Sequence, residues 1–159
     1  MYYPRLPEQA GLWLEEQCIG ADLLKKDMSN LLMKYQLAQV NIARMREPLD
    51  HPLMQEFVHF LGPINELAER AAGYVWRLQD ESGNATAIRA FDDDRILPNL
   101  TVWESIESLK EYVFKTDHAR FLRRRREWFE TMDDLPVLTM WWIPAGHIPT
   151  LAEARERSD

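Results

Sequence analysis

The order of strand-like and helix-like segments after Tyr35 constrains the fold of this chain more than any other feature. Alternation of polar and apolar residues predicts strands, and apolar residues spaced three and four apart predict helices. By these two periods the chain runs strand, helix, strand, strand, two helices, strand. Two strand–helix–strand crossovers around one sheet predict an α+β fold, a ferredoxin-like βαββαβ layer whose antiparallel sheet carries helices on one face.

The predicted strands are short segments that end at turn signals. Pro98 indicates an irregular or edge position at the start of the third strand. The segment Ala85–Asp94 is ambiguous and fits either a short strand or a packed loop. The predicted strands are Tyr35–Arg44, Tyr74–Gln79, Ile96–Trp103 and Pro136–Ile143.

The predicted helices begin at capping residues or at proline in its favoured first turn. We expect the first helix to kink at Gly62-Pro63 and to end at Gly73. The last helix is short and polar. The start signals are, in chain order, Asp50-His51-Pro52, Ser105, Thr116-Asp117 and Thr150.

Residues 1–34 differ from the rest, and we assign them to an N-terminal extension that is helical or loosely packed, with residues 35–159 as the domain. The leucines of the extension fit one or two short amphipathic helices, interrupted near Gly20. Met33 directly precedes the first strand, so two explanations stay open. Either the native start is Met33, or the extension is an added helix that packs on the domain.

Composition argues against several classes of partner. The net charge of the 159 residues is -7, which makes nucleic acid and anionic membranes poor candidates. No apolar run approaches the roughly 18 residues that span a bilayer, and the N-terminus lacks the pattern of a signal peptide. The single cysteine, Cys18, rules out an internal disulfide. We therefore expect a cytoplasmic protein.

Aromatic mass is concentrated in the second half, because five of the six tryptophans follow residue 75. We expect much of it on the sheet face that turns away from the helices, where so large an apolar area would be costly in water. This predicts a two-fold homodimer packed sheet against sheet, with a cavity for a small apolar ligand between sheet and helices. That face is expected to carry Gln39, Asn41, Trp76 or Arg77, Trp103 and a tryptophan of the last strand.

Two polar residues are the candidate catalytic groups. His118 shares a helix face with Phe121 and Leu122, so an imidazole is aimed at the same interior as two bulky apolar side chains. With a pKa near 6.5 it suits a general base or an axial metal ligand, and a histidine packed between layers is the structural alternative. Asn41 could hold a substrate oxygen or a dioxygen-derived anion through its amide donors, or it is a sheet amide satisfied by backbone.

Aromatic and basic residues are candidates for ligand contacts. The aromatic side chains fit the wall of a substrate pocket, and core or dimer interface is the alternative. Arg77 and Arg89 could bind a carboxylate or a haem propionate, with surface or interface ion pairs as the alternative. No histidine or cysteine spacing is typical of a metal site. The candidate wall residues are Trp103, Trp76, Tyr112, Phe121 and Trp141.

Five segments carry a resemblance to an uncharacterised bacterial family of the dimeric α+β barrel superfamily, over Tyr35 to about Arg157. That superfamily includes antibiotic-biosynthesis-type and haem-degrading monooxygenases. Its haem degraders place an asparagine on the first strand, a tryptophan on the helix after the third strand, and an iron-ligating histidine beyond it. Asn41 and His118 match the first and last positions, whereas Tyr112 stands at the middle one with a shorter spacing. The segments are Leu37–Ala43, Gly73–Gln79, Asn99–Ser105, Phe121–Phe129 and Trp141–His147.

Three hypotheses follow from residues and resemblance together. In the first, a monooxygenase-like enzyme without a built-in cofactor acts on a small apolar or aromatic molecule, with His118 as base and Asn41 as oxyanion donor. In the second, the protein binds or degrades haem, with His118 as the iron ligand. In the third, it is a non-catalytic dimeric module that binds a hydrophobic ligand or stabilises an assembly.

Overall fold

Four strands form one antiparallel sheet in the order β2-β3-β1-β4. The central strand β1 pairs with β3 on one side and with β4 on the other, and β3 also pairs with β2. Each crossover therefore skips one strand, which is the arrangement of the ferredoxin-like α+β fold and confirms that prediction. The strands are β1 (Tyr35–Arg44), β2 (Tyr74–Arg77), β3 (Ile96–Trp103) and β4 (Leu138–Pro144).

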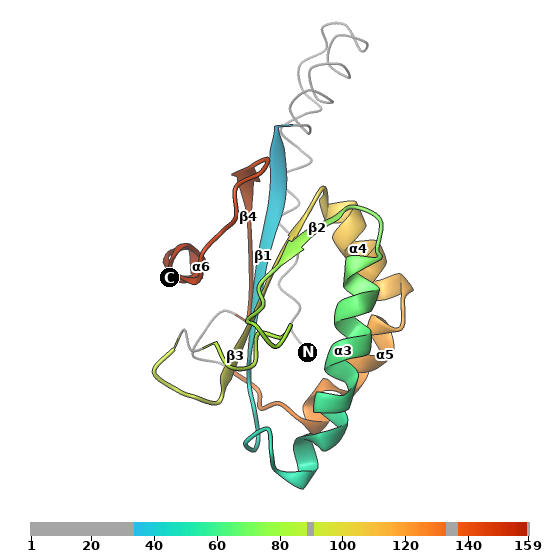
Figure 1. Ribbon diagram of the computed structural model, residues 1–159, viewed down its shortest axis with the longest axis vertical. Coiled ribbons are helices and arrows are strands. Elements are labelled where there is room, and N and C mark those ends of the chain that lie inside the picture. The colour runs from blue at the N-terminus through green and yellow to red at the C-terminus, as the bar shows by residue number, and fades with distance from the viewer. Residues whose placement is uncertain (1–33, 89–90, 133–136, 159) are drawn as a thin grey trace, which may run out of the picture. The chain divides into compact units, whose positions relative to one another are not determined.

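Helices lie on both sides of this sheet in the computed structural model, which describes residues 34–88, 91–132 and 137–158. Figure 1 shows α3, α4 and α5 on one side and α6 on the other. A 3₁₀ turn at Pro52–Met54 leads into the first of these helices, and another at Arg125–Glu127 follows α5. The helices are α3 (Gln55–Glu69), α4 (Ile106–Lys115), α5 (His118–Arg124) and α6 (Leu151–Ser158).

Local signals in the sequence explain where these helices begin. Ser105 accepts a hydrogen bond from the backbone N–H of Ser108 at 3.1 Å, and Thr150 accepts one from that of Glu153, also at 3.1 Å. Pro63 lies inside α3, which continues through it. The described part of the ambiguous segment 85–94 consists of turns and bends rather than a strand.

The chain divides into two units, residues 1–33 and 34–159. The predictions for the extension, Met33 and Cys18 among them, fall outside the described residues. Within the described residues, no helix combines the length and apolarity that crossing a bilayer requires.

Two apolar clusters fill the layer between the sheet and helices α3 to α5. Both combine strand residues with helix residues, and they lie at opposite ends of the long strands. The first cluster consists of Leu37, Ala68, Trp103, Leu109 and Tyr112, and the second of Met45, Met54, Phe57, Leu97 and Trp128.

The predicted assignment of sheet faces is wrong for Gln39, Asn41 and Trp103. Trp103 packs on α3 and α4 residues, and the other two share its face through register and alternation. Alternation shows which residues share a face but not which face meets the helices. The opposite face is the more uniformly apolar one, and its cluster contains Ala38, Val40, Ile42, Ile96, Leu100, Val102, Met132, Trp141, Ile143 and Ala154.

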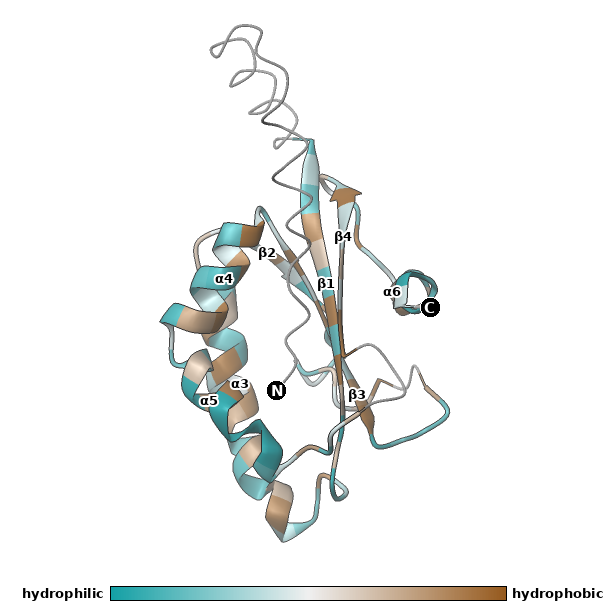
Figure 2. Ribbon diagram, turned by 180° about the vertical axis from the view of Figure 1, so that it is seen from behind, coloured by the Kyte–Doolittle hydropathy of each residue, from teal (hydrophilic) through white to brown (hydrophobic). Residues whose placement is uncertain are grey.

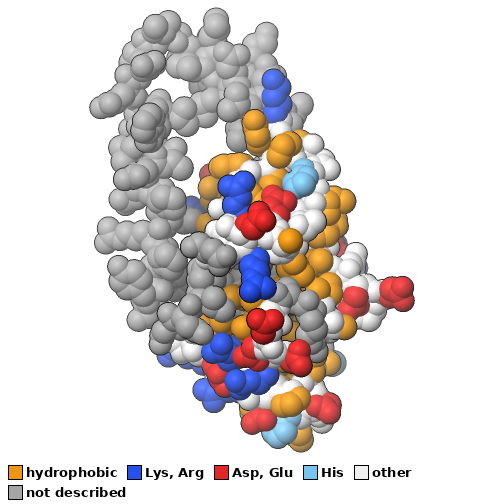
Figure 3. All heavy atoms as spheres, turned by 90° about the vertical axis from the view of Figure 1, so that its left-hand side faces the viewer, with side chains coloured by type: hydrophobic (Ala, Val, Ile, Leu, Met, Phe, Trp, Pro, Cys, Tyr) orange, Lys and Arg blue, Asp and Glu red, His pale blue; other side chains and the backbone are white. Residues whose placement is uncertain are grey.

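Helix α6 packs on this opposite face through Leu151 and Ala154 and through a few polar contacts. The Trp141 indole donates to Glu153 at 2.9 Å, and His147 Nε2 lies 2.8 Å from the other oxygen of that carboxylate. The helix is largely hydrophilic (Figure 2), and apolar side chains run among charged ones over the face that it lies on (Figure 3). The predicted homodimer through the sheet face stays a prediction, and α6 already occupies part of that face.

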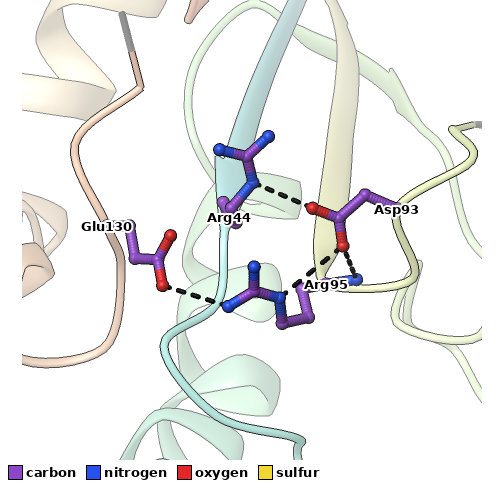
Figure 4. Close-up of polar contacts among 4 residues, drawn as sticks. All are labelled: Arg44, Asp93, Arg95 and Glu130. Atoms are coloured by element: carbon purple, nitrogen blue, oxygen red, sulfur yellow. Dashed lines mark hydrogen bonds and ion pairs between the residues drawn. The ribbon is translucent and has the colours of Figure 1, made fainter.

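An ionic chain holds the far end of β1 (Figure 4). Arg44 contacts Asp93 at 2.9 Å, Asp93 contacts Arg95 at 3.7 Å, and Arg95 reaches Glu130 at 3.1 Å. Glu130 in turn donates its backbone N–H to the Arg44 carbonyl at 2.9 Å. Three segments distant in the sequence therefore meet where the second apolar cluster ends.

Gly73 offers a test of the packing between β2 and α4. Its φ is +75°, and a Cβ there would lie 2.2 Å from Ser108 Oγ and 2.6 Å from Ser108 Cβ. We expect Gly73→Ala to lower the free energy of unfolding by about 3 kcal/mol, because backbone strain and a clash act together. Gly83→Ala is the matched control, since its φ is +82° with open space around the new Cβ, and it should cost about 1 kcal/mol. Urea unfolding measures both, and equal losses would contradict the clash.

Candidate functional site

Polar side chains interrupt the helix-facing side of the sheet between the two apolar clusters. Gln39 pairs with Thr101 and Asn41 with Asn99 in the register of β1 and β3. The first apolar cluster, around Trp103, lies towards one end of the strands. The second, around Met45 and Trp128, lies towards the other end. A polar patch on two neighbouring strands thus lies in an otherwise apolar layer.

Hydrogen bonds join this polar patch to the buried indole of Trp103. The indole N–H donates to Thr101 Oγ1 at 2.9 Å, and the Thr101 hydroxyl donates to Gln39 Oε1 at 2.9 Å. Asn41 Oδ1 accepts two bonds, one from Gln39 Nε2 at 2.9 Å and one from Asn99 Nδ2 at 3.0 Å. The Asn41 carbonyl is therefore satisfied by two neighbouring side chains rather than by the backbone.

His118 lies at the first position of α5, where the chain leaves α4. Its ring Nδ1 is 3.3 Å from the carbonyl oxygen of Val113 in the last turn of α4. A carbonyl accepts only, so this contact favours the tautomer with the proton on Nδ1 and the lone pair on Nε2. The backbone N–H of His118 donates to Thr116 Oγ1 at 3.2 Å. Together these bonds fix the ring at the junction of the two helices.

Burial lowers the pKa of His118 below its ordinary value, and the hydrogen bond to the Val113 carbonyl offsets part of that effect. Removing an imidazole from water disfavours its charged form. The ring is therefore neutral at physiological pH, with Nε2 available as a base or as a metal ligand. The predicted reactivity of His118 is compatible with its surroundings.

Aromatic rings connect His118 to both apolar clusters. Tyr112 stacks on Trp103 with centroids 5.1 Å apart and lies 4.8 Å from the His118 ring. On the other side, Phe121 is 6.4 Å from His118 and stacks on Trp128 at 5.1 Å. Of the predicted wall residues, Tyr112 and Phe121 therefore contact the His118 ring, and Trp103 is linked to it through Tyr112.

Trp76 and Trp141 do not join this group. Both pack with the cluster on the opposite face of the sheet. A register shift in β2 between Tyr74 and Trp76 places Arg77 on the helix side. There the buried Arg77 forms a 2.8 Å ion pair with Glu69 of α3, so its partner is a carboxylate within the chain rather than at the surface or an interface. Arg89 falls outside the described residues.

Asn41 and His118 contribute to the same layer from opposite sides, Asn41 from the sheet and His118 from the helices. Among the described residues, no hydrogen bond joins them directly. Two hollows, of about 270 and 310 Å³, lie elsewhere: one between β1 and α6, the other beside Met45 and Leu49. The predicted cavity lined by both side chains stays a prediction.

Sequence reasoning missed Gln39 and Thr101 as site residues. The signal was present, because polar residues occupy positions 39 and 41 of one strand and 99 and 101 of another at the same spacing of two. Facing strands with matched polar positions predict a polar ladder once the register is known. For metals, no cluster of three potential ligands occurs in the part of the chain that the structure describes.

Comparison with known proteins identifies a family. Residues 36–159 match the model of a domain of unknown function, DUF3291, as the resemblance predicted. No curated protein matches the chain significantly.

Three solved structures are similar to the chain at low sequence identity. SnoaB, a cofactor-independent oxygenase from Streptomyces nogalater, is 13% identical, with 71% of this chain and 95% of that chain covered and a TM-score of 0.44. A proposed antibiotic biosynthesis monooxygenase from Chloroflexus aurantiacus is 18% identical, covering 70% and 96%, with a TM-score of 0.43. A conserved protein from Methanosarcina mazei is 14% identical, covering 72% and 96%, with a TM-score of 0.47.

The lowered pKa of His118 predicts how stability depends on pH. Below pH 6.5 the unfolded chain binds a proton that the folded chain does not, so the free energy of unfolding should fall as the pH drops from about 7.5 to 5.5. His118→Gln should remove part of this decline, because glutamine does not titrate. Urea unfolding at both pH values measures the difference, with His59→Gln on the exposed side of α3 as control. A histidine titration by NMR with a midpoint above 6.5 would contradict the burial effect.

Proposed function

We propose that this chain, which belongs to the DUF3291 family of domains of unknown function, binds a small aromatic molecule with an acidic C–H or O–H group between its sheet and helices. There it promotes the reaction of the resulting anion with dioxygen without a built-in cofactor. His118 removes the proton and Asn41 holds the oxyanion. The aromatic rings of Tyr112 and Phe121, which adjoin His118, contact the bound molecule.

One observation carries the proposal: Asn41 and His118 both occupy the interval between the two apolar clusters. Tyr112 belongs to the first cluster and Phe121 packs against the second, and the His118 ring contacts both. On the sheet side the same interval holds Gln39 and Asn41. The polar patch lies on the sheet side of this layer and the neutral imidazole on its helix side, which supports the proposal of a proton-abstracting site.

Each of the two groups retains the atom that its role needs. The carbonyl of Asn41 accepts two hydrogen bonds, and among the described residues its NH₂ group has no acceptor. His118 uses Nδ1 for the Val113 carbonyl, which leaves Nε2 for the substrate. An amide donor and a basic nitrogen are therefore both available.

The chemistry balances without a cofactor when the substrate supplies the electrons. His118 Nε2 takes a proton from an activated CH₂ group, and the Asn41 amide stabilises the negative oxygen of the enolate. The electron-rich anion reduces dioxygen and binds one of its atoms at the same carbon. Loss of water then gives a ketone, so that CH₂ and O₂ become C=O and H₂O. Exclusion of bulk water strengthens both interactions.

Haem binding is the second candidate, because the geometry of His118 also suits an iron ligand. A ligating histidine usually donates its other ring N–H to a carbonyl or carboxylate, as Nδ1 does here. Arg77, the candidate propionate partner, is held by Glu69 instead. Bound haem would supply redox chemistry to the same layer. A Soret shift on addition of haem that is lost in His118→Ala would favour this function over the first.

A non-catalytic module is the third candidate, and native ligand content separates it from an enzyme. An aromatic molecule released on denaturation, combined with no turnover of enolisable compounds, would favour a binding protein. The homodimer predicted from the sequence is part of the proposed function in each of the three cases. Sedimentation of the full chain measures the oligomeric state.

Anthrone, an enolisable aromatic ketone, is a suitable probe for the oxygenase proposal. We expect the protein to accelerate dioxygen uptake and anthraquinone formation, with one atom of ¹⁸O₂ retained in the product. His118→Gln should lower kcat by about 10²–10⁴-fold, as expected for loss of a general base. Asn41→Asp keeps the shape and both accepted hydrogen bonds but presents a carboxylate, and it should lower kcat by about 10²–10³-fold.

The exposed variant His59→Gln is the control for these measurements and should retain full activity. Circular dichroism establishes that each variant is folded. If His118→Gln or Asn41→Asp oxidises anthrone at the rate of the unchanged protein, the assigned roles are wrong.

A further inference from the structure

We infer that Gln39 and Thr101 are positioning residues that orient the amide of Asn41 with its NH₂ group outward, so that the site selects ligands presenting an oxyanion there. The inference rests on the proposed function for the identity of the ligand-facing residue. It explains why that site would prefer ligands that accept hydrogen bonds.

The direction of the hydrogen bonds is set at Trp103. An indole N–H only donates, so its 2.9 Å contact makes Thr101 Oγ1 an acceptor. The Thr101 hydroxyl keeps one hydrogen of its own, and Gln39 Oε1 at 2.9 Å accepts it. With Gln39 reversed, its NH₂ group would face that hydroxyl, and the buried O–H would lose this acceptor. The indole therefore favours one orientation of the glutamine amide.

The same reasoning extends to Asn41. With its oxygen bound by Thr101, Gln39 offers Nε2, which donates to Asn41 Oδ1 at 2.9 Å. Asn99 Nδ2 donates to the same oxygen at 3.0 Å. A reversed Asn41 would place its own NH₂ group against the donor that Gln39 presents. The outward end of the Asn41 amide is therefore the NH₂ group.

The hydrogen bonds from Trp103 through Thr101 and Gln39 to Asn41 form a relay. Burial makes its inner part, from Trp103 to Gln39, rigid, while its outer end at Asn41 remains accessible. Trp103, Gln39 and Thr101 are 0%, 5% and 6% exposed, so water does not readily replace their partners. Asn41 is half-buried and Asn99 is exposed. The orientation set at the buried indole thus reaches a side chain that a ligand can contact.

Selectivity between two ligands of the same shape tests the inference. At about pH 8, 4-nitrophenol is an anion whose oxygen accepts hydrogen bonds, whereas 4-nitroaniline presents an NH₂ donor at the same position. We expect the full-length protein to bind 4-nitrophenolate about tenfold more tightly than 4-nitroaniline, measured by calorimetry. Asn41→Ala should abolish the preference, which locates the probes at this residue.

Gln39→Glu is the informative variant, because it replaces an amide by a carboxylate of the same shape that accepts but does not donate. It should accept the Thr101 hydroxyl on one side and the Asn41 NH₂ group on the other. Asn41 then presents its oxygen, and the preference should change to 4-nitroaniline. Thr101→Val adds no charge and should bring the ratio close to one, whereas Thr101→Ser keeps the hydroxyl and should retain the preference.

Side-chain amide hydrogen exchange gives a readout without any ligand. In the unchanged protein the NH₂ protons of Gln39 should exchange slowly and those of Asn41 fast, and Gln39→Glu should protect the Asn41 protons. If neither probe binds but this exchange pattern holds, the relay stands and the proposed function fails. If the probes bind through Asn41 but Gln39→Glu and Thr101→Val keep the unchanged ratio and exchange pattern, the relay is overturned. Thermal unfolding confirms that each variant is folded, and Thr101→Ser shows that the position tolerates substitution.

Discussion

The antiparallel register between β1 and β3 is the constraint on which the candidate site depends. It places Gln39 opposite Thr101 and Asn41 opposite Asn99, so that side chains far apart in the sequence meet on one face. A slip of one residue would move these polar groups to the opposite face and expose the apolar set that now packs there. The hydrophobic pattern on both faces therefore protects the register, and the register assembles the polar patch.

The polar patch is stable in an apolar layer because its buried groups satisfy one another. A buried polar group without a partner costs about 1–3 kcal/mol. Three buried polar groups are linked here by hydrogen bonds, namely the Trp103 indole, the Thr101 hydroxyl and the Gln39 amide. Replacing the patch by leucine or valine would be a simple way to join the two clusters into one core. Packing alone therefore does not require a hydrogen-bond relay at this position, and its presence supports a role in binding.

The sequence predicted the architecture well because its signals were local and periodic. The strand β1, the third strand and the caps at Ser105 and Thr150 all follow from alternation or capping chemistry. The sequence did not predict which sheet face meets the helices, because an alternation with a period of two is the same for both faces. The same symmetry placed Trp76 and Trp141 in the predicted pocket wall, whereas both lie on the other face. The relay through Gln39 and Thr101 required the register, which depends on tertiary pairing and on no local signal.

The environment of His118 separates a packed histidine from a reactive one. A packed imidazole gains most when both of its ring nitrogens have hydrogen-bond partners. His118 satisfies Nδ1 alone, and among the described residues Nε2 has no hydrogen-bond partner. Desolvation keeps the ring neutral, so that nitrogen retains a lone pair in a layer that also holds an amide with a surplus of donors. A base without a proton and a donor without an acceptor are complementary to the two ends of one acidic substrate, and neither is required by the fold.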